Sequence, residues 1–310
     1  MSPNALGAVY MMASMACFIA NDAVMKTFAG QMTWYEALAV RGGMGVAVCL
    51  ALCLVIDGPR PVREVGRYIA DAPTALRVVC ELGSTALFLL ALFNMPLAGA
   101  TAIVQTLPLL LTIGGALFFA ERVGARRLAA ALVGFAGVLL IIRPGTATFQ
   151  PAAFYALFAA VFMAGRDLLT KAVPKDIPST YVNLWTTIGV WIMALVLTVP
   201  GGFPPVDVWI LVKLFCAAVL IGVGFLFAIL TVRTGEISFV APFRYSILIW
   251  SLVLGFVVFG EVPEPLTLIG AAVVVTAGLY TFARERRADR NEPIASASAP
   301  ISADNQSRKI

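Results

Sequence analysis

Histidine is absent from the 310-residue chain, and charged residues make up only 13% of it. Without histidine, the chain cannot build a Cys-His zinc site, a histidine proton relay or a Ser-His catalytic pair. The sequence also lacks a Gly-x-x-x-x-Gly-Lys nucleotide-binding loop and a His-Glu-x-x-His motif, so it supports neither ATP-driven transport nor an intramembrane metalloenzyme. We therefore expect no catalytic residue, no metal site and no cofactor.

The chain contains five cysteines, an odd number, and all of them fall inside apolar runs. Cysteines placed in this way usually behave as small hydrophobic side chains, and they do not favour a disulfide framework. We expect free thiols at Cys17, Cys49, Cys53, Cys80 and Cys216.

Hydrophobic residues account for 60% of the chain, and the mean hydropathy is +0.92. A run of about 20 apolar residues crosses a hydrocarbon core as a helix, because lipid offers no partner to unpaired backbone amides. The sequence therefore predicts an all-α integral membrane protein with ten transmembrane helices. Breaks at proline, glycine and charged clusters place these spans at about 5–28, 34–56, 74–94, 98–120, 126–143, 152–171, 180–199, 207–231, 238–259 and 265–283.

Basic residues concentrate in the even-numbered connections and just after the last span, whereas the odd-numbered connections contain only Arg143. Because cytoplasmic loops carry an excess of Lys and Arg, we expect both termini to be cytoplasmic. The basic residues that set this orientation are Arg60, Arg63, Arg67, Arg122, Arg126, Arg127, Lys171, Lys175, Arg233, Arg284, Arg286, Arg287 and Arg290.

The two halves of the chain resemble each other at three places that occur in the same order. Each half would contain five spans, an odd number, so the second half would be inverted in the membrane relative to the first. Inverted repeats that rock about a central site are typical of secondary transporters. The matched segments are Asp22 to Lys26 with Asp167 to Lys171, Thr33 to Tyr35 with Ser179 to Tyr181, and Phe118 to Glu121 with Val258 to Glu261.

Several stretches resemble the drug/metabolite transporter superfamily, in particular its ten-helix EamA class. In the first half these are Ala91 to Ala102, Pro108 and Glu121-Arg-Val; in the second half they are Ala241 to Tyr245 and Gly260-Glu261. The Ala-Asn21-Asp22 element and the Ala241 to Tyr245 segment look most like bacterial members that take up S-adenosylmethionine or riboflavin. The resemblance implies alternating access in a bacterial inner membrane, and it covers nearly the whole chain up to about residue 283.

On this basis the chain divides into a first EamA-type repeat over residues 1–145, a second over 150–284, and a polar tail over 285–310. The tail is rich in Ser, Ala, Asn and Pro and cannot bury enough surface to fold, so we expect it to be disordered and cytoplasmic. Its basic start is expected to flank the last span on the cytoplasmic side, and contact with anionic lipid head groups is the alternative role.

Charged residues inside the spans predict a polar pathway, because a charge at the bilayer centre costs about 2.5 to 3.5 kcal/mol on insertion scales. In an outer cluster, Arg41 is expected to pair with Asp22 or to bind an anionic group of the substrate. Two clusters could act as gates closed by ion pairs. The alternative is that residues near helix ends only anchor those ends. The outer cluster comprises Asp22, Lys26, Glu36 and Arg41; the inner one comprises Arg77, Glu81, Arg166, Asp167, Lys171 and Arg244.

Arg41 and Arg244 lie deeper in their spans than the other charged residues, so we expect them to contact substrate or a gate. Uncharged side chains between the two clusters are expected to donate hydrogen bonds and to stack on a ring-bearing ligand. These are Gln105, Thr106, Asn183, Trp185 and Tyr245. Pro108 and Pro242 are expected to kink their helices beside the site, and Glu121 and Glu261 to stabilise the start of the fifth helix of each repeat.

Taken together, these features predict a secondary transporter that moves a small polar metabolite across the bacterial inner membrane, with uptake favoured over export. The substrates considered are a vitamin such as riboflavin, S-adenosylmethionine, an amino acid or an amine. An exporter of the same fold is the alternative, and an intramembrane enzyme is the rival from another class. The expected partners are the substrate and the lipid bilayer, with a homodimer as a further option and no nucleic acid.

Overall fold

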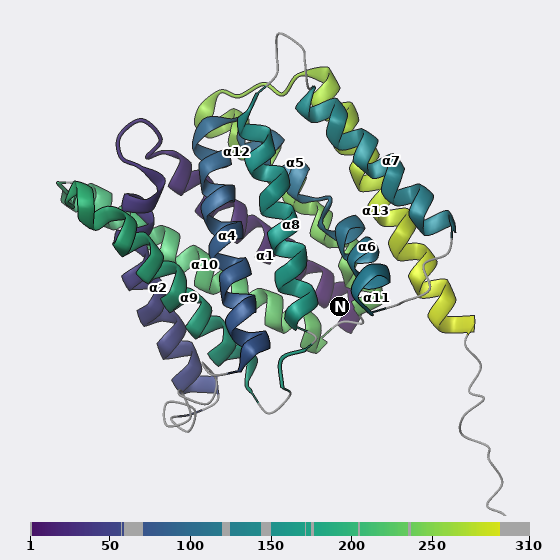
Figure 1. Ribbon diagram of the computed structural model, residues 1–310, viewed down its shortest axis with the longest axis horizontal. Helices are drawn as coiled ribbons and strands as arrows, with labels where there is room; N and C mark the ends of the chain where they lie inside the picture. Colours follow the sequence, from purple (N-terminus) through teal and green to yellow (C-terminus); the bar gives the residue numbers. More distant parts are fainter. Residues whose placement is uncertain are drawn as a thin grey trace, which may run out of the picture.

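The computed structural model describes residues 2–56, 58, 71–119, 125–143, 150–170, 172–174, 177–203, 205–234 and 237–291 (Figure 1). Helices account for all of the regular secondary structure in these ranges. In chain order the elements are α1 (Pro3–Lys26), α2 (Trp34–Ile56), α4 (Ala72–Asn94), α5 (Leu97–Val104), α6 (Leu107–Phe119), α7 (Ala125–Ile142), α8 (Ala152–Thr170), α9 (Ser179–Thr198), η2 (Val199–Gly201), α10 (Val208–Thr234), α11 (Ile237–Val240), η3 (Ala241–Tyr245), α12 (Ser246–Phe259) and α13 (Pro265–Asn291).

Eight helical segments in the described ranges are long and apolar enough to cross a membrane. Two further apolar helices, Leu128–Ile142 and Pro265–Tyr280, are shorter. The predicted all-helical membrane architecture is therefore confirmed. The last helix, α13, continues to Asn291, so the first polar residues after 284 extend a helix; the rest of the predicted tail lies outside the described residues.

Short polar side chains define where several helices begin. Asp71 caps α4 by accepting a hydrogen bond from the backbone N–H of Thr74 at 3.0 Å. At the start of α2, the Glu36 carboxylate accepts a hydrogen bond from the Thr33 N–H at 2.7 Å, and the Thr33 hydroxyl accepts one from the Glu36 N–H at 3.4 Å. This reciprocal pair is a capping box, so Glu36 stabilises a helix start here and has no ionic partner among the described outer-cluster residues.

Two of the predicted spans are discontinuous. The span predicted for 98–120 is divided into α5 and α6, because the α-helix stops at Val104 and a new one begins at Leu107, with Pro108 in its first turn. The span predicted for 238–259 is interrupted by the 3-10 turn η3, which holds Pro242. Proline lacks the backbone N–H that a continuous helix needs, so it is tolerated at these new starts.

The helices pack as pairs that join distant parts of the sequence: α1 with α10, α4 with α8, α2 with α9, and α7 with α13. Figure 1 shows α7 and α13 side by side at one edge of the bundle. Glycine allows the closest approaches. A Cβ atom at Gly137 would lie 2.9 Å from the Gly270 carbonyl oxygen, so the α7–α13 contact requires glycine at this crossing.

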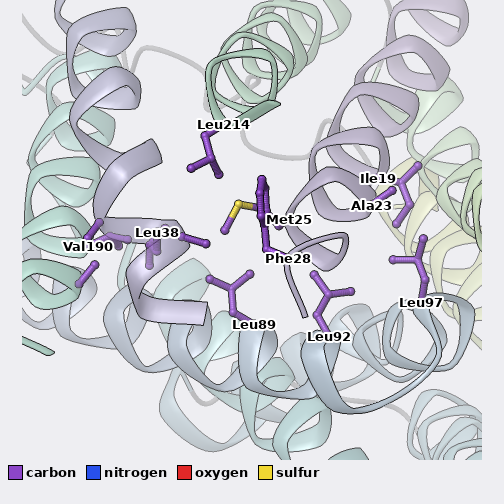
Figure 2. Packing of buried hydrophobic residues seen from close by; sticks show 13 residues of the cluster. Ile19, Ala23, Met25, Phe28, Leu38, Leu89, Leu92, Leu97, Val190 and Leu214 are labelled. Atoms are coloured by element: carbon purple, nitrogen blue, oxygen red, sulfur yellow. The ribbon is translucent and has the colours of Figure 1, made fainter. Parts of the chain in front are cut away.

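One of the two main hydrophobic clusters in the described part of the chain lies at the end of the bundle where α1, α4 and α9 terminate, called here the Lys26 end. In Figure 2, Met25 and Phe28 lie between Leu38, Leu89 and Leu214. Met25 and Phe28 have no exposed surface. The ammonium of Lys213, for which the sequence alone suggested no role, lies 5.9 Å from the centre of the Phe28 ring. The cluster therefore joins side chains from both halves of the chain at the Lys26 end.

Candidate functional site

A cavity of about 100 Å³ lies among α2, α4, α9 and α10. It brings together three of the predicted site residues, Arg41, Glu81 and Asn183, from three different helices. Four further polar side chains line it, and none of these belonged to the predicted site: Cys49, Thr85, Thr186 and Thr187. An enclosed space with convergent polar and charged groups is the usual form of a small-molecule site.

Arg41 reaches toward α1 as predicted, but its direct partner is Asn21 and not Asp22. One guanidinium nitrogen of Arg41 donates a hydrogen bond to the Asn21 side-chain oxygen. The Asn21 amide in turn donates to the Asp22 carboxylate at 3.0 Å. Asn21 is only 3% exposed, so it holds Arg41 in place and links it to the neighbouring negative charge. Sequence reasoning did not place Asn21 in the site, although the Ala-Asn21-Asp22 element was among the segments that carried the family resemblance.

The inner cluster forms around Arg166. Its guanidinium donates to the Glu81 carboxylate and to the Asp167 carboxylate, each at 2.8 Å. Arg77 joins the same region by donating to the Thr170 hydroxyl at 2.9 Å and to the Thr186 hydroxyl at 2.7 Å. These contacts tie α4 to α8 and α9. Of the two other predicted members, Lys171 lies outside the described residues and Arg244 lies on η3.

Apolar and small residues form the other walls of the cavity. Phe225 of α10 lines it, and the Phe225 ring packs edge-on against Phe18 of α1 with ring centres 5.2 Å apart. Gly45 and Gly222 line the cavity as well. A Cβ atom at Gly222 would lie 2.6 Å from a methyl carbon of Val48, so glycine there allows α2 and α10 to pack closely. Phe225 is the aromatic residue among those described as lining the cavity, but nothing in the sequence distinguishes it from the other phenylalanines of the apolar spans.

The remaining predicted residues do not line this cavity. Arg244 and Tyr245 lie on η3; the Arg244 side chain is exposed and lies within electrostatic reach of Asp167. The Tyr245 hydroxyl is buried beside α13 and has no hydrogen-bond partner within the described residues, and the same holds for the Trp185 indole nitrogen. Gln105 is 6% exposed at the break between α5 and α6.

Lys26 does not join Arg41. Its ammonium forms an ion pair with Glu261 and donates a hydrogen bond to the Met95 carbonyl at 2.7 Å. The other oxygen of Glu261 accepts from the backbone N–H of Leu97 at 2.8 Å, at the first turn of α5. Glu261 therefore stabilises a helix start as expected, but that helix is α5 and not α13. Its counterpart, Glu121, lies outside the described residues.

The Lys26–Glu261 ion pair is shielded from solvent, since the two side chains are 10% and 21% exposed. The ammonium also lies 5.1 Å from the centre of the Phe259 ring. These contacts join the end of α1, the α4–α5 junction and the α12–α13 connection directly beside the hydrophobic cluster at the Lys26 end. Among the described residues, no group of three His, Cys, Asp or Glu side chains is arranged to hold a metal ion.

A helical membrane protein with ionic side chains around an internal cavity has the features of a solute transporter. Comparison with known proteins agrees with this class. The EamA-like transporter family model matches the chain twice, over residues 5–143 and 150–283, so the chain belongs to the EamA-like transporter family. It is accordingly a multi-pass membrane transporter of a small molecule and not an enzyme.

Relatives of known name include a riboflavin transporter of Vibrio cholerae, which is 31% identical over 70% of this chain and 73% of its own length. An S-adenosylmethionine uptake transporter of Rickettsia bellii is 26% identical over 62% of this chain and 66% of its own. A pseudopaline exporter of Pseudomonas aeruginosa is 26% identical over 66% and 69%. One solved crystal structure matches 92% of this chain and 99% of its own with a TM-score of 0.58 and 19% identity, which supports the fold alone.

Proposed function

We propose that this protein is a secondary transporter that takes up a small polar metabolite across a bacterial inner membrane by alternating access. The cavity that joins Arg41, Glu81 and Asn183 carries the proposal, because lipid disfavours such groups unless they face partners or an aqueous pathway. Riboflavin and S-adenosylmethionine head the candidate substrates because relatives with these names are similar over most of their length. Amino acids and amines remain in the candidate set.

We propose further that the ten predicted spans form two inverted five-helix repeats, 1–145 and 150–284. Under this relation α1 corresponds to α8, α2 to α9, α4 to α10, and α7 to α13. The α1–α10 contact in one orientation then corresponds to the α8–α4 contact in the other. The α2–α9 and α7–α13 contacts are each formed by two equivalent helices. The two discontinuous spans also correspond. The cavity lies among α2, α9, α4 and α10, which are two pairs of equivalent helices, as expected for a site near the axis relating two repeats.

In this transport cycle the Lys26–Glu261 pair and the hydrophobic cluster beside it form the closed outer gate. The Arg166–Glu81 and Arg166–Asp167 contacts belong to the inner half and would rearrange when the opposite side closes. Both termini are proposed to be cytoplasmic, which puts the Lys26 end on the periplasmic side. Ion pairs suit this task because removing water strengthens them, whereas opening the gate returns each partner to water.

The proposal is tested by uptake into proteoliposomes with radiolabelled riboflavin, S-adenosylmethionine, amino acids and amines. We expect one of these compounds to accumulate, and Arg41→Ala to reduce its uptake by at least about tenfold, since a hydrogen bond to a charged group contributes about 1.5–3 kcal/mol. Arg244→Ala should also reduce uptake. Normal membrane insertion of both variants is the control.

Uptake of none of these compounds would contradict the proposed function. Full activity in Arg41→Ala would remove the proposed site, because Arg41 lines the cavity. Export is the alternative direction, because alternating access is reversible and one relative is named as an exporter. Efflux from preloaded proteoliposomes under an imposed ion gradient distinguishes the two directions, since only the physiological direction should be accelerated by the coupled gradient.

A further inference from the structure

Two side chains of opposite charge face the same small cavity. Arg41 enters from α2 and Glu81 from α4, and both line the space together with Asn183 of α9. Their structural partners, Asn21 and Arg166, do not line it. The cavity therefore presents a positive group and a negative group to whatever it contains, while the groups that fix them lie behind its walls.

Each of the two charged groups keeps hydrogen-bonding capacity beyond its structural contact. Among the described residues, Arg41 donates one hydrogen bond, to Asn21, although a guanidinium carries five donors. The Glu81 side chain accepts one described bond, from Arg166 to a single carboxylate oxygen, although a carboxylate can accept about four. Both groups can therefore bind a ligand without giving up the contacts that hold them.

The neutral groups between these charges are held weakly. The Asn183 amide donates to the Cys49 sulfur at 3.6 Å, which is a weak hydrogen bond. The Thr187 hydroxyl donates to the Asn183 carbonyl at 2.9 Å and retains acceptor capacity. A ligand oxygen at this point would give the Asn183 amide a better acceptor than the Cys49 sulfur, and a ligand donor could reach the Thr187 hydroxyl oxygen without breaking its backbone contact.

The size of the cavity limits what it can enclose. Its volume is about 100 Å³. Ligand pockets for whole metabolites usually measure roughly 300 to 1,000 Å³. In this conformation the cavity can therefore hold a polar head group of a few atoms, and the remainder of a larger substrate must lie where the cavity widens on opening.

Charge selects among head groups of this size. An anion beside Arg41 would also face Glu81, a cation beside Glu81 would also face Arg41, and a neutral group would leave the spare donors of Arg41 and the spare acceptors of Glu81 without a charged partner in the ligand. We infer that the cavity binds a zwitterionic head group, of the kind that carries an ammonium and a carboxylate on one carbon. The carboxylate contacts Arg41 and the ammonium contacts Glu81. This inference rests on the proposed transport function and names its substrate class.

Binding to the purified full-length chain in nanodiscs tests the inference, with ligand-induced thermal stabilisation as the readout. The ligands are S-adenosylmethionine, methionine and phenylalanine, each compared with an analogue lacking the carboxylate and an analogue lacking the amine. We expect at least one zwitterion to bind at least about tenfold more tightly than both of its analogues, as charge-assisted hydrogen bonds at both ends predict.

The variants assign the two ends of the ligand separately. Arg41→Gln should abolish the preference over the analogue without a carboxylate and retain the preference over the analogue without an amine, and Arg41→Lys should restore part of the former. Glu81→Gln should abolish the preference over the analogue without an amine and retain the preference over the analogue without a carboxylate. Arg143→Gln and Glu36→Gln remove charges outside the cavity and should keep both preferences. If a cavity variant fails to fold, the comparison of each zwitterion with its two analogues in the wild-type protein still tests whether the cavity binds a zwitterionic head group.

Two outcomes overturn this inference and leave the transport function standing. One is uptake of riboflavin with no preference for any zwitterion over its analogues. The other is equal loss of both preferences in Arg41→Gln and Glu81→Gln, in protein that melts normally. Absence of uptake of every compound in proteoliposomes would instead contradict the proposed function itself.

Discussion

Gly45 controls the room available in the cavity, because its position on α2 leaves space that a side chain would fill. A methyl group there would lie 3.8 Å from the Thr187 methyl carbon, an ordinary contact. Alanine is also favoured over glycine in a helix by about 1 kcal/mol. We therefore expect Gly45→Ala to match or exceed the thermal stability of the wild type while slowing uptake in proteoliposomes, most strongly for the bulkiest transported compound.

Gly42→Ala provides the matched comparison. Its new methyl group would lie 2.5 Å from a ring carbon of Trp191, whose indole N–H donates to the Ala39 carbonyl at 2.9 Å. This variant should therefore lose stability as well as activity. Unchanged uptake in stably folded Gly45→Ala would show that the cavity does not hold the substrate.

The capping box at the start of α2 separates stability from transport at a second position. Thr33→Ala removes the hydroxyl that accepts the Glu36 N–H, and loss of such a cap costs about 1 kcal/mol. We expect a lower melting temperature in detergent and uptake per folded molecule equal to that of the wild type. A loss of uptake at normal stability would contradict this expectation and would support the predicted role of Glu36 in the outer gate.

At the level of residues, charge within an apolar span was the informative signal. It singled out Arg41 and Glu81 from the amino-acid sequence alone, because such residues are too costly to face lipid. It could not identify Asn21, which carries no charge, or Phe225, which resembles every other apolar residue in its span. It also could not separate Lys26 from Arg41, since that depends on how α1 turns relative to α2 and on the position of Glu261.

Among the elements, the two discontinuous spans are the parts most able to change shape. Pro242 lies in η3 between α11 and α12. Proline inside a regular helix is disfavoured by about 3 kcal/mol, so Pro242→Ala should allow α11 and α12 to merge into one stable helix. We expect increased thermal stability with a several-fold lower maximal rate of uptake and little change in apparent affinity.

The same substitution at Pro108, in the first turn of α6, should act in the same direction if the two breaks serve equivalent roles. Uptake at the wild-type rate in both proline variants would contradict a role for these breaks in the transport cycle. A lower rate that accompanies lost stability would point instead to a packing defect.

Helix positions could be predicted from the sequence, because a long continuous apolar run crosses lipid as a helix, in which the backbone N–H and C=O groups pair with each other. The predicted span 34–56 coincides with α2, and the predicted 152–171 differs from α8 by a single residue at its end. The division of 98–120 was not predicted, because Gln105 and Thr106 lie in an otherwise unbroken apolar run and Pro108 indicated only a kink. Which helices pair was also not predicted, because pairing depends on long-range packing.

In the whole molecule, the Lys26–Glu261 pair joins parts of both halves at one end of the bundle. Glu261→Gln removes the ion pair but keeps an oxygen that can accept the Leu97 N–H, so the start of α5 should survive. We expect this variant to open more often at the Lys26 end. The measurable result is faster labelling of a cavity residue from that side. We also expect a clear fall in melting temperature, because the pair is shielded from solvent and Lys26 would lose its ionic partner.

Cys49 provides that cavity residue, since it lines the site as a free thiol. Labelling of Cys49 by a membrane-impermeant thiol reagent, in protein whose other four cysteines are replaced by alanine, tests alternating access at this cavity most directly. We predict that the reagent reaches Cys49 from either face of the membrane in separate experiments, that transported substrate slows both reactions, and that Glu261→Gln accelerates labelling from the Lys26 end. Labelling from one face only, unaffected by substrate, would contradict alternating access at this cavity.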